Sequence, residues 1–101
     1  MLECCASMGY MKTAKQLERH FKGVSNHTRI EILLVIAKNS GITVEGITRE
    51  LNKNFKTVSE HTRRLVQAGL VEKSYSGRSV THVLSPYGKR FAMFIKSFQH
   101  S

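Results

Sequence analysis

The spacing of apolar residues changes at Gly69 from a helical repeat to alternation. Before this glycine, apolar side chains recur every three or four positions, which is typical of amphipathic helices. After it, two short stretches, 70–75 and 80–84, alternate apolar and polar residues around a turn that contains Gly77. Two such stretches predict a β-hairpin. We therefore expect a mainly α domain that carries a single hairpin.

Five helices are expected, because apolar residues recur at helical spacing in five stretches, and most of these stretches have a capping residue before them or a helix-breaking residue after them. Gly23 is expected to stop the first helix. The last helix is expected to have Ser85 as its cap and Pro86 at its first position, where the missing N–H costs nothing. Residues 1–10 are expected to form a flexible arm before a domain that spans 11–101. The expected helices cover about 11–22, the stretch from a cap at Ser25 or Asn26 to Lys38, 44–51, 55–68, and the stretch from Pro86 onward.

The third and fourth expected helices, 44–51 and 55–68, are separated by only three residues. A short helix, a tight turn and a longer helix with one apolar face form the layout of a helix-turn-helix. The second helix of that unit enters the major groove of DNA. The hairpin, 70–84, follows as a wing. The expected fold is a winged helix-turn-helix with the order α-α-α-α-β-β-α.

The outward face of the 55–68 helix is expected to contact DNA, because its side chains are mostly basic or hydroxylated. Glu60 adds nothing to phosphate binding, so its presence on this face favours contact with bases. Arg78 at the tip of the wing can reach a phosphate or the minor groove. The candidate DNA-binding residues are Lys53, Asn54, Lys56, Thr57, Ser59, Glu60, Arg63, Arg64, Lys73 and Arg78.

The chain is strongly basic, with a net charge of +9 from 16 Lys and Arg residues against 7 Asp and Glu residues. This excess favours a polyanionic partner such as DNA, RNA or an anionic membrane. The longest apolar run, 32–37, is far shorter than the roughly 18 residues of a membrane helix, and residues 1–11 do not form a secretory signal. We expect a cytoplasmic protein that binds double-stranded DNA and no membrane.

Several segments resemble ArsR-like winged-helix repressors. The resemblance covers residues 17–98, and its spacing of Thr-Val-Ser followed by Leu-x-x-x-Gly-Leu-Val is typical of winged-helix DNA binders. The stretch 83–91 is more similar to MarR-type or archaeal winged-helix regulators. The matching segments are 21–33 (FKGVSNHTRIEIL), 51–71 (with TVSEH and LVQAGLV) and Gly77-Arg78 at the wing turn.

The resemblance implies a homodimeric repressor whose first and last helices form the dimer interface. The residues themselves also favour association, because the aromatic stripe of Phe91, Phe94 and Phe98 is large for the terminal helix of a small chain. The alternative is that this stripe packs on the core of its own chain. The expected interface residues are Leu17, Phe21, Phe91, Phe94, Ile95 and Phe98.

No metal, cofactor or catalytic site is expected. ArsR-like metal sites use a Cys-x-Cys pair in the third helix or Asp and His residues on the last one, and neither 44–51 nor 87–99 contains these. Cys4 and Cys5 are either incidental thiols, ligands of a soft metal across a dimer, or a redox sensor; two thiolates alone do not fill a tetrahedral site. The sequence also lacks a nucleophile elbow and a phosphate-binding glycine loop, so we expect no enzyme.

Two other functions remain open at this point. A winged helix can be a protein-interaction module, and a basic one can bind nucleic acid without sequence preference. The basic, Ser- and Thr-rich face of the 55–68 helix favours DNA over a protein partner, since protein interfaces are depleted in Lys. A nonspecific binder would depend almost wholly on phosphates.

Overall fold

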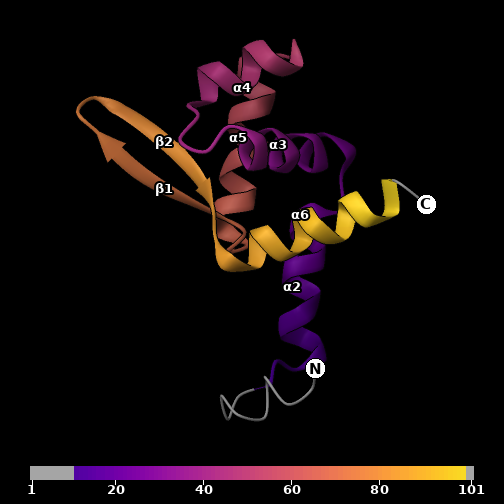
Figure 1. Ribbon diagram of the computed structural model, residues 1–101. Coiled ribbons are helices and arrows are strands. Elements are labelled where there is room, and N and C mark those ends of the chain that lie inside the picture. Colours follow the sequence, from indigo (N-terminus) through magenta and orange to yellow (C-terminus); the bar gives the residue numbers. More distant parts are fainter. Residues whose placement is uncertain (1–10, 100–101) are drawn as a thin grey trace.

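The computed structural model describes residues 11–99, and Figure 1 shows them as five helices and one antiparallel hairpin. The expected winged helix-turn-helix order is confirmed. Residues 1–10, which contain Cys4 and Cys5 and were expected to form a flexible arm, lie outside the described residues. In chain order the elements are α2 (Ala14–Val24), α3 (His27–Lys38), α4 (Val44–Leu51), α5 (Phe55–Gln67), β1 (Val71–Ser76), β2 (Ser79–Leu84) and α6 (Pro86–Gln99).

Side-chain caps define the starts of the first four helices. Thr13, Asn26, Thr43 and Asn54 each accept a hydrogen bond from a backbone N–H in the first turn that follows. At α2 the cap is a capping box, because the Gln16 side chain also accepts from the backbone N–H of Thr13. The sequence predicted the caps of α3, α4 and α5, but α2 begins three residues later than expected.

Gly23 does not stop the first helix, contrary to expectation. α2 continues to Val24, and Gly23 is buried inside it. A Cβ atom on Gly23 would overlap the Cβ of Ala68. A glycine is required at this position because α2 passes very close to the end of α5. It destabilises α2 only slightly, because it lies near the end of the helix.

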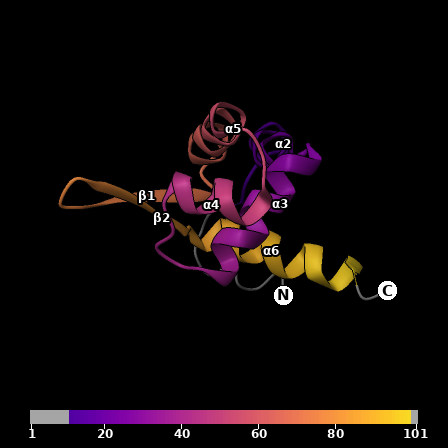
Figure 2. The same ribbon diagram turned by 90° about the horizontal axis from the view of Figure 1, so that it is seen from above.

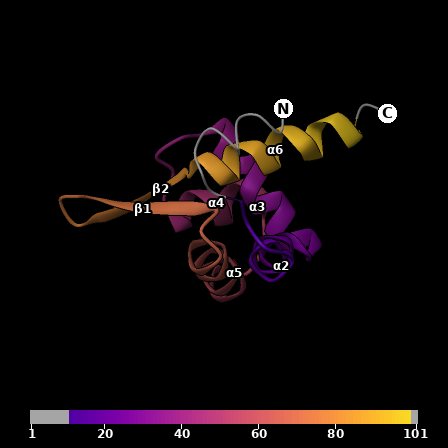
Figure 3. The same cartoon turned by 90° about the horizontal axis from the view of Figure 1, so that it is seen from below.

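α3 lies in the middle of the fold. In Figures 2 and 3, α5 and α6 lie on opposite sides of it. Covered from several directions, α3 buries Ile32, Leu33 and Ile36 fully, together with Ile47 of α4 and Val58 of α5. α3 therefore buries residues on more than the one face that a single apolar stripe would cover.

The wing is a regular two-stranded hairpin that projects from the helices (Figure 1). Its register runs from the pair Val71↔Leu84 to the pair Ser76↔Ser79 at the turn. Gly77, with a φ of 63°, occupies the first central position of the two-residue turn, where a left-handed residue matches the strand twist. The base of the wing is held by Ile42, whose backbone bridges to His82.

Gly88, in the first turn of α6, lies against the backbone of Leu70. A Cβ at Gly88 would overlap the carbonyl oxygen of Leu70. This oxygen belongs to the backbone between α5 and β1, so it cannot easily move aside. We expect Gly88→Ala to lower the free energy of unfolding by about 1–3 kcal/mol, although alanine normally favours a helix. Chemical denaturation would measure this change. The exposed neighbour Lys89 is the control, since Lys89→Ala should shift stability by less than about 0.5 kcal/mol. A Gly88→Ala protein as stable as the parent would contradict this packing.

Candidate nucleic-acid interface

The turn between α4 and α5 aims α5 outward. Asn52 adopts the left-handed conformation, with φ 55°, a region that Asn enters more readily than most residues. Two residues later, the side-chain oxygen of Asn54 accepts hydrogen bonds from the N–H groups of Lys56 (2.8 Å) and Thr57 (3.2 Å). Asn54 therefore fixes the first turn of α5, and its amide NH₂ stays available to a ligand.

The two faces of α5 differ as expected. Val58, Thr62 and Leu65 are buried, while Lys56 and Thr57 are exposed. Of the other predicted contact residues on this helix, Ser59 and Glu60 are half-buried and Arg63 and Arg64 are exposed. α5 therefore presents a continuous polar face to solvent.

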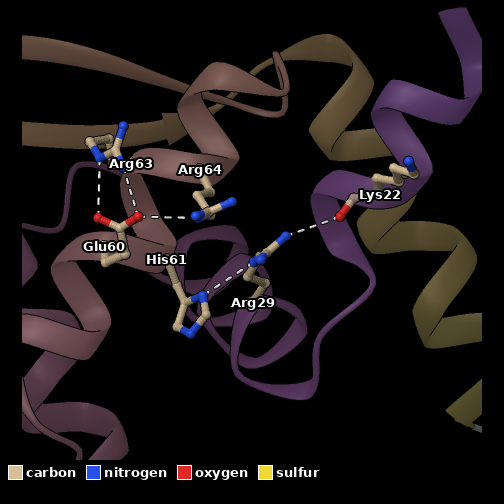
Figure 4. Close-up of polar contacts among 6 residues, drawn as sticks. All are labelled: Lys22, Arg29, Glu60, His61, Arg63 and Arg64. Atoms are coloured by element: carbon tan, nitrogen blue, oxygen red, sulfur yellow. Dashed lines mark hydrogen bonds and ion pairs between the residues drawn. The ribbon is translucent and has the colours of Figure 1, made fainter.

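Glu60 binds two of the predicted contact residues. Its carboxylate accepts hydrogen bonds from Arg63, at 2.7 Å to the nearest nitrogen, and from Arg64 at 3.1 Å (Figure 4). These hydrogen bonds lower the pKa of Glu60. The ion pairs give Glu60 a role that needs no base contact, and they hold both guanidinium groups along the helix surface.

Arg29 connects α5 with α2. From α3, its Nε donates to Nδ1 of His61 at 3.2 Å, and its terminal nitrogen donates to the carbonyl of Lys22 at 3.0 Å (Figure 4). The His61 nitrogen that accepts this bond must be unprotonated, so the contact requires the neutral ring. Burial, and then the nearby charges of Arg29 and Arg64, lower the pKa of His61.

The predicted cations fall into two groups. Lys53 pairs with Glu31 of α3 at 3.4 Å, and Arg63 and Arg64 share Glu60. Within residues 11–99, no carboxylate pairs with the remaining three. These unpaired cations, Lys56 on α5 and Lys73 and Arg78 on the wing, are all exposed.

Two exposed aromatic residues on the same elements were not predicted. Phe55 begins α5 and has 51% of its surface exposed, and Tyr75 on β1 is exposed as well. Apolar residues at these positions fit the regular pattern of helix and strand, so the pattern does not single them out. The exposure of Phe55 could have been predicted from its neighbours in the sequence. Phe55 lies between the capping residue Asn54 and Lys56, at a helix start that faces solvent.

The predicted dimer residues lie on α2 and α6, which meet where the ring of Phe21 packs edge-on against Phe91, with 5.2 Å between centroids. Phe91 is half-buried against the core, as is Ile95, so part of the α6 stripe does pack on its own chain. The rest is exposed. These exposed residues are Leu17, Phe21, Phe94 and Phe98, and the stripe on α2 thus faces out, while His20, Gly23 and Val24 face in.

Residues 11–99 contain no group of three His, Cys, Asp or Glu side chains placed to hold a metal ion. Their helices are also too short or too polar to cross a membrane.

The fold has close structural relatives among regulators. The homodimeric winged helix-turn-helix DNA-binding domain of Mb0332 from Mycobacterium bovis has a TM-score of 0.76 at 24% identity, over 85% of this chain and 80% of that one. HlyU from Vibrio cholerae has a TM-score of 0.79 at 21% identity, over 89% and 98%. FabT of Streptococcus pneumoniae, solved in complex with DNA, has a TM-score of 0.68 at 24% identity, over 71% and 52%. Among curated protein sequences, none matches this chain.

The helix-turn-helix of α4 and α5, followed by the β1–β2 hairpin, defines a winged helix-turn-helix protein. Residues 26–73 match the model of the arsR family of bacterial regulatory proteins. Over this segment, just under half of its length, the chain is similar to that family. It is a DNA-binding transcriptional regulator and not an enzyme, in agreement with the sequence-based expectation.

The neutral state of His61 makes stability depend on pH. His27 and Arg29 face it from α3, and Glu60 and Arg64 face it from its own helix. Because folding lowers its pKa, the folded state resists protonation, and stability present above the ordinary value near 6.5 is lost as the pH falls through the folded value.

We therefore expect the free energy of unfolding of the parent protein, relative to a His61→Gln variant, to fall between about pH 7.5 and about pH 5.5. Urea denaturation of both proteins at each pH would measure this difference. Comparison with the variant cancels the other histidines, which titrate in both proteins. A difference that stays constant across this range would show that His61 is not held neutral by folding.

Proposed function

We propose that the chain is a sequence-specific repressor that binds double-stranded DNA in the cytoplasm as a homodimer. α5 lies in the major groove, and the wing formed by β1 and β2 lies on the flanking backbone or in the minor groove. The observation that carries this proposal is the set of unpaired, exposed cations, Lys56, Lys73 and Arg78, on the two elements that a winged helix turns toward DNA.

Structural relatives support the two parts of the proposal. The Mb0332 domain is described as homodimeric and DNA-binding, and FabT was solved with DNA bound. In this chain α6 lies on the other side of α3 from α5 (Figures 2 and 3), so α6 can carry a dimer contact while α5 stays free.

Selection of DNA from a random pool tests the proposal, with affinity for the selected sequence compared against scrambled DNA. A palindromic site, bound on the order of 10³-fold more tightly than scrambled DNA, is the expected result for a dimeric, sequence-specific regulator. Salt-sensitive binding without a preferred sequence would favour a chromatin-like or RNA-binding role. Absence of binding would favour a protein-interaction module.

Lys56→Ala and Arg78→Ala should each weaken DNA binding without disturbing the fold. Each removes an exposed cation that no described carboxylate neutralises. A lysine that contacts phosphate should lower the slope of log affinity against log salt by about 1 when removed. Fluorescence anisotropy over a salt series measures both effects. Lys96→Ala removes the same charge from α6, on the other side of α3 from α5 (Figures 2 and 3), so it should leave the slope unchanged. If all three variants bind alike, the proposed face is wrong.

Phe94→Glu should disrupt the dimer. Phe94 is exposed and contacts Phe98 with 4.8 Å between ring centroids, so a charge there would enter the proposed apolar interface. Light scattering should show about half the mass of the parent protein. Met93→Glu is the matched control, because Met93 is at least as exposed as Phe94 but lines a groove with Ala37 and Val83 on another side of α6. An unchanged mass for Phe94→Glu would refute the predicted interface.

A further inference from the structure

Phe55 is an apolar residue in a polar place. It is the first residue of α5, and 51% of its surface is exposed. It shares a shallow hollow of the surface with Lys56, Thr57 and Glu60. The exposed phenylalanines of the other described helices, Phe21 on α2 and Phe94 and Phe98 on α6, lie at the proposed dimer face. Phe55 therefore belongs to the proposed DNA face and not to the dimer face.

The backbone around Phe55 is fixed before any partner binds. The Asn54 side chain accepts from the N–H groups of both residues that follow Phe55, so the first turn of α5 is formed in the free protein. Below it, Val58 is fully buried and anchors the same turn to the core. The exposed part of the ring is thus presented on a rigid helix start, with little conformational freedom to lose on binding.

The chemistry of a phenyl ring restricts what it can recognise in a groove. The ring has no hydrogen-bond donor or acceptor and no charge, so it gains nothing from phosphates or from the polar edges of bases. In the major groove the apolar group that base pairs display is the 5-methyl group of thymine, and Phe is among the side chains that contact it. The first residues of a recognition helix are those that meet base edges.

We propose that Phe55 is a specificity-determining residue that packs against the 5-methyl group of a thymine in each half-site. This inference rests on the proposed function, because it needs α5 in the major groove. The contact adds a requirement on the DNA sequence that the cations and hydroxyl groups of α5 do not impose. The bound site must have an A·T pair, with its thymine methyl toward Phe55, at a fixed place in each half.

Deoxyuridine tests the proposal directly, because it pairs like thymidine but lacks the methyl group. Each thymine of the selected DNA site is replaced by deoxyuridine, one symmetric pair of positions at a time, and affinity is measured by anisotropy. We expect the wild-type protein to lose about fourfold per contacted methyl, as burial of one CH₂ of about 0.8 kcal/mol predicts. The loss should appear at one position in each half-site.

Two variants assign the effect to Phe55. Phe55→Ala should bind the thymine and deoxyuridine duplexes with equal affinity at that position, near the affinity of the wild-type protein for the deoxyuridine duplex. Lys56→Ala, the matched control, should bind both duplexes more weakly and keep the same ratio between them as the wild-type protein, about fourfold per methyl group. Circular dichroism and thermal melting check that each variant is folded, and the wild-type comparison does not depend on any variant.

The outcomes separate this inference from the function beneath it. If the wild-type protein selects a specific site but binds its deoxyuridine forms equally well, the inference is overturned and the regulator remains. If Phe55→Ala keeps the full deoxyuridine loss, another residue reads the methyl group and the inference is also overturned. If no sequence is preferred at all, the proposed function fails first and this inference fails with it.

Discussion

Hydrogen bonds to three successive carbonyl groups, those of Ala68, Gly69 and Leu70, connect α2 and the start of α6 to the link between α5 and β1. The His20 ring on α2 donates from Nδ1 to Ala68 at 2.9 Å. The hydroxyl of Ser85 donates to Gly69 at 2.6 Å, and the backbone N–H of Ser85 donates to Leu70 at 3.0 Å. The last carbonyls of a helix have no partner within it. Here α2 supplies the partner of Ala68, the C-cap of α5, and Ser85, just before α6, supplies the partners of Gly69 and Leu70 in the link to the wing.

Close packing at the same link between α5 and β1 fixes the positions of α2 and α6. Gly23 of α2 lies directly against Ala68, and Gly88 of α6 lies directly against Leu70, so a side chain on either glycine would push a helix away. Both helices that carry the proposed dimer face are therefore anchored where α5 turns into β1. The spacing of two half-sites mirrors the distance between the two recognition helices of a dimer. A rigid link between the proposed dimer face and α5 would keep that distance fixed.

The fold could be predicted from the sequence wherever a short stretch of chain decides the structure. Asn54 caps α5 and Gly77 makes the wing turn through contacts within a few residues, and both were predicted. Gly23 was predicted wrongly because its surroundings come from α5, which is far away along the chain. The pairing of Glu60 with the arginines three and four positions later has a spacing that the sequence displays. The contact of His61 with Arg29 depends on how α3 and α5 pack, and no local pattern indicates it.

The distribution of charge shows how the proposed sequence preference is compatible with a net charge of +9. If every cation on the reading face were unpaired, phosphate contacts would dominate, and these carry no sequence information. Glu60 offsets part of that attraction at the centre of α5, while the unpaired Lys56 and Arg78 lie at the start of the helix and at the tip of the wing. Exposed ion pairs are weak, so a phosphate or a base can replace Glu60 as the partner of an arginine. In the proposed complex, the strongest attraction that is independent of sequence therefore acts at the edges of the face, and its centre is available for contacts that depend on the base.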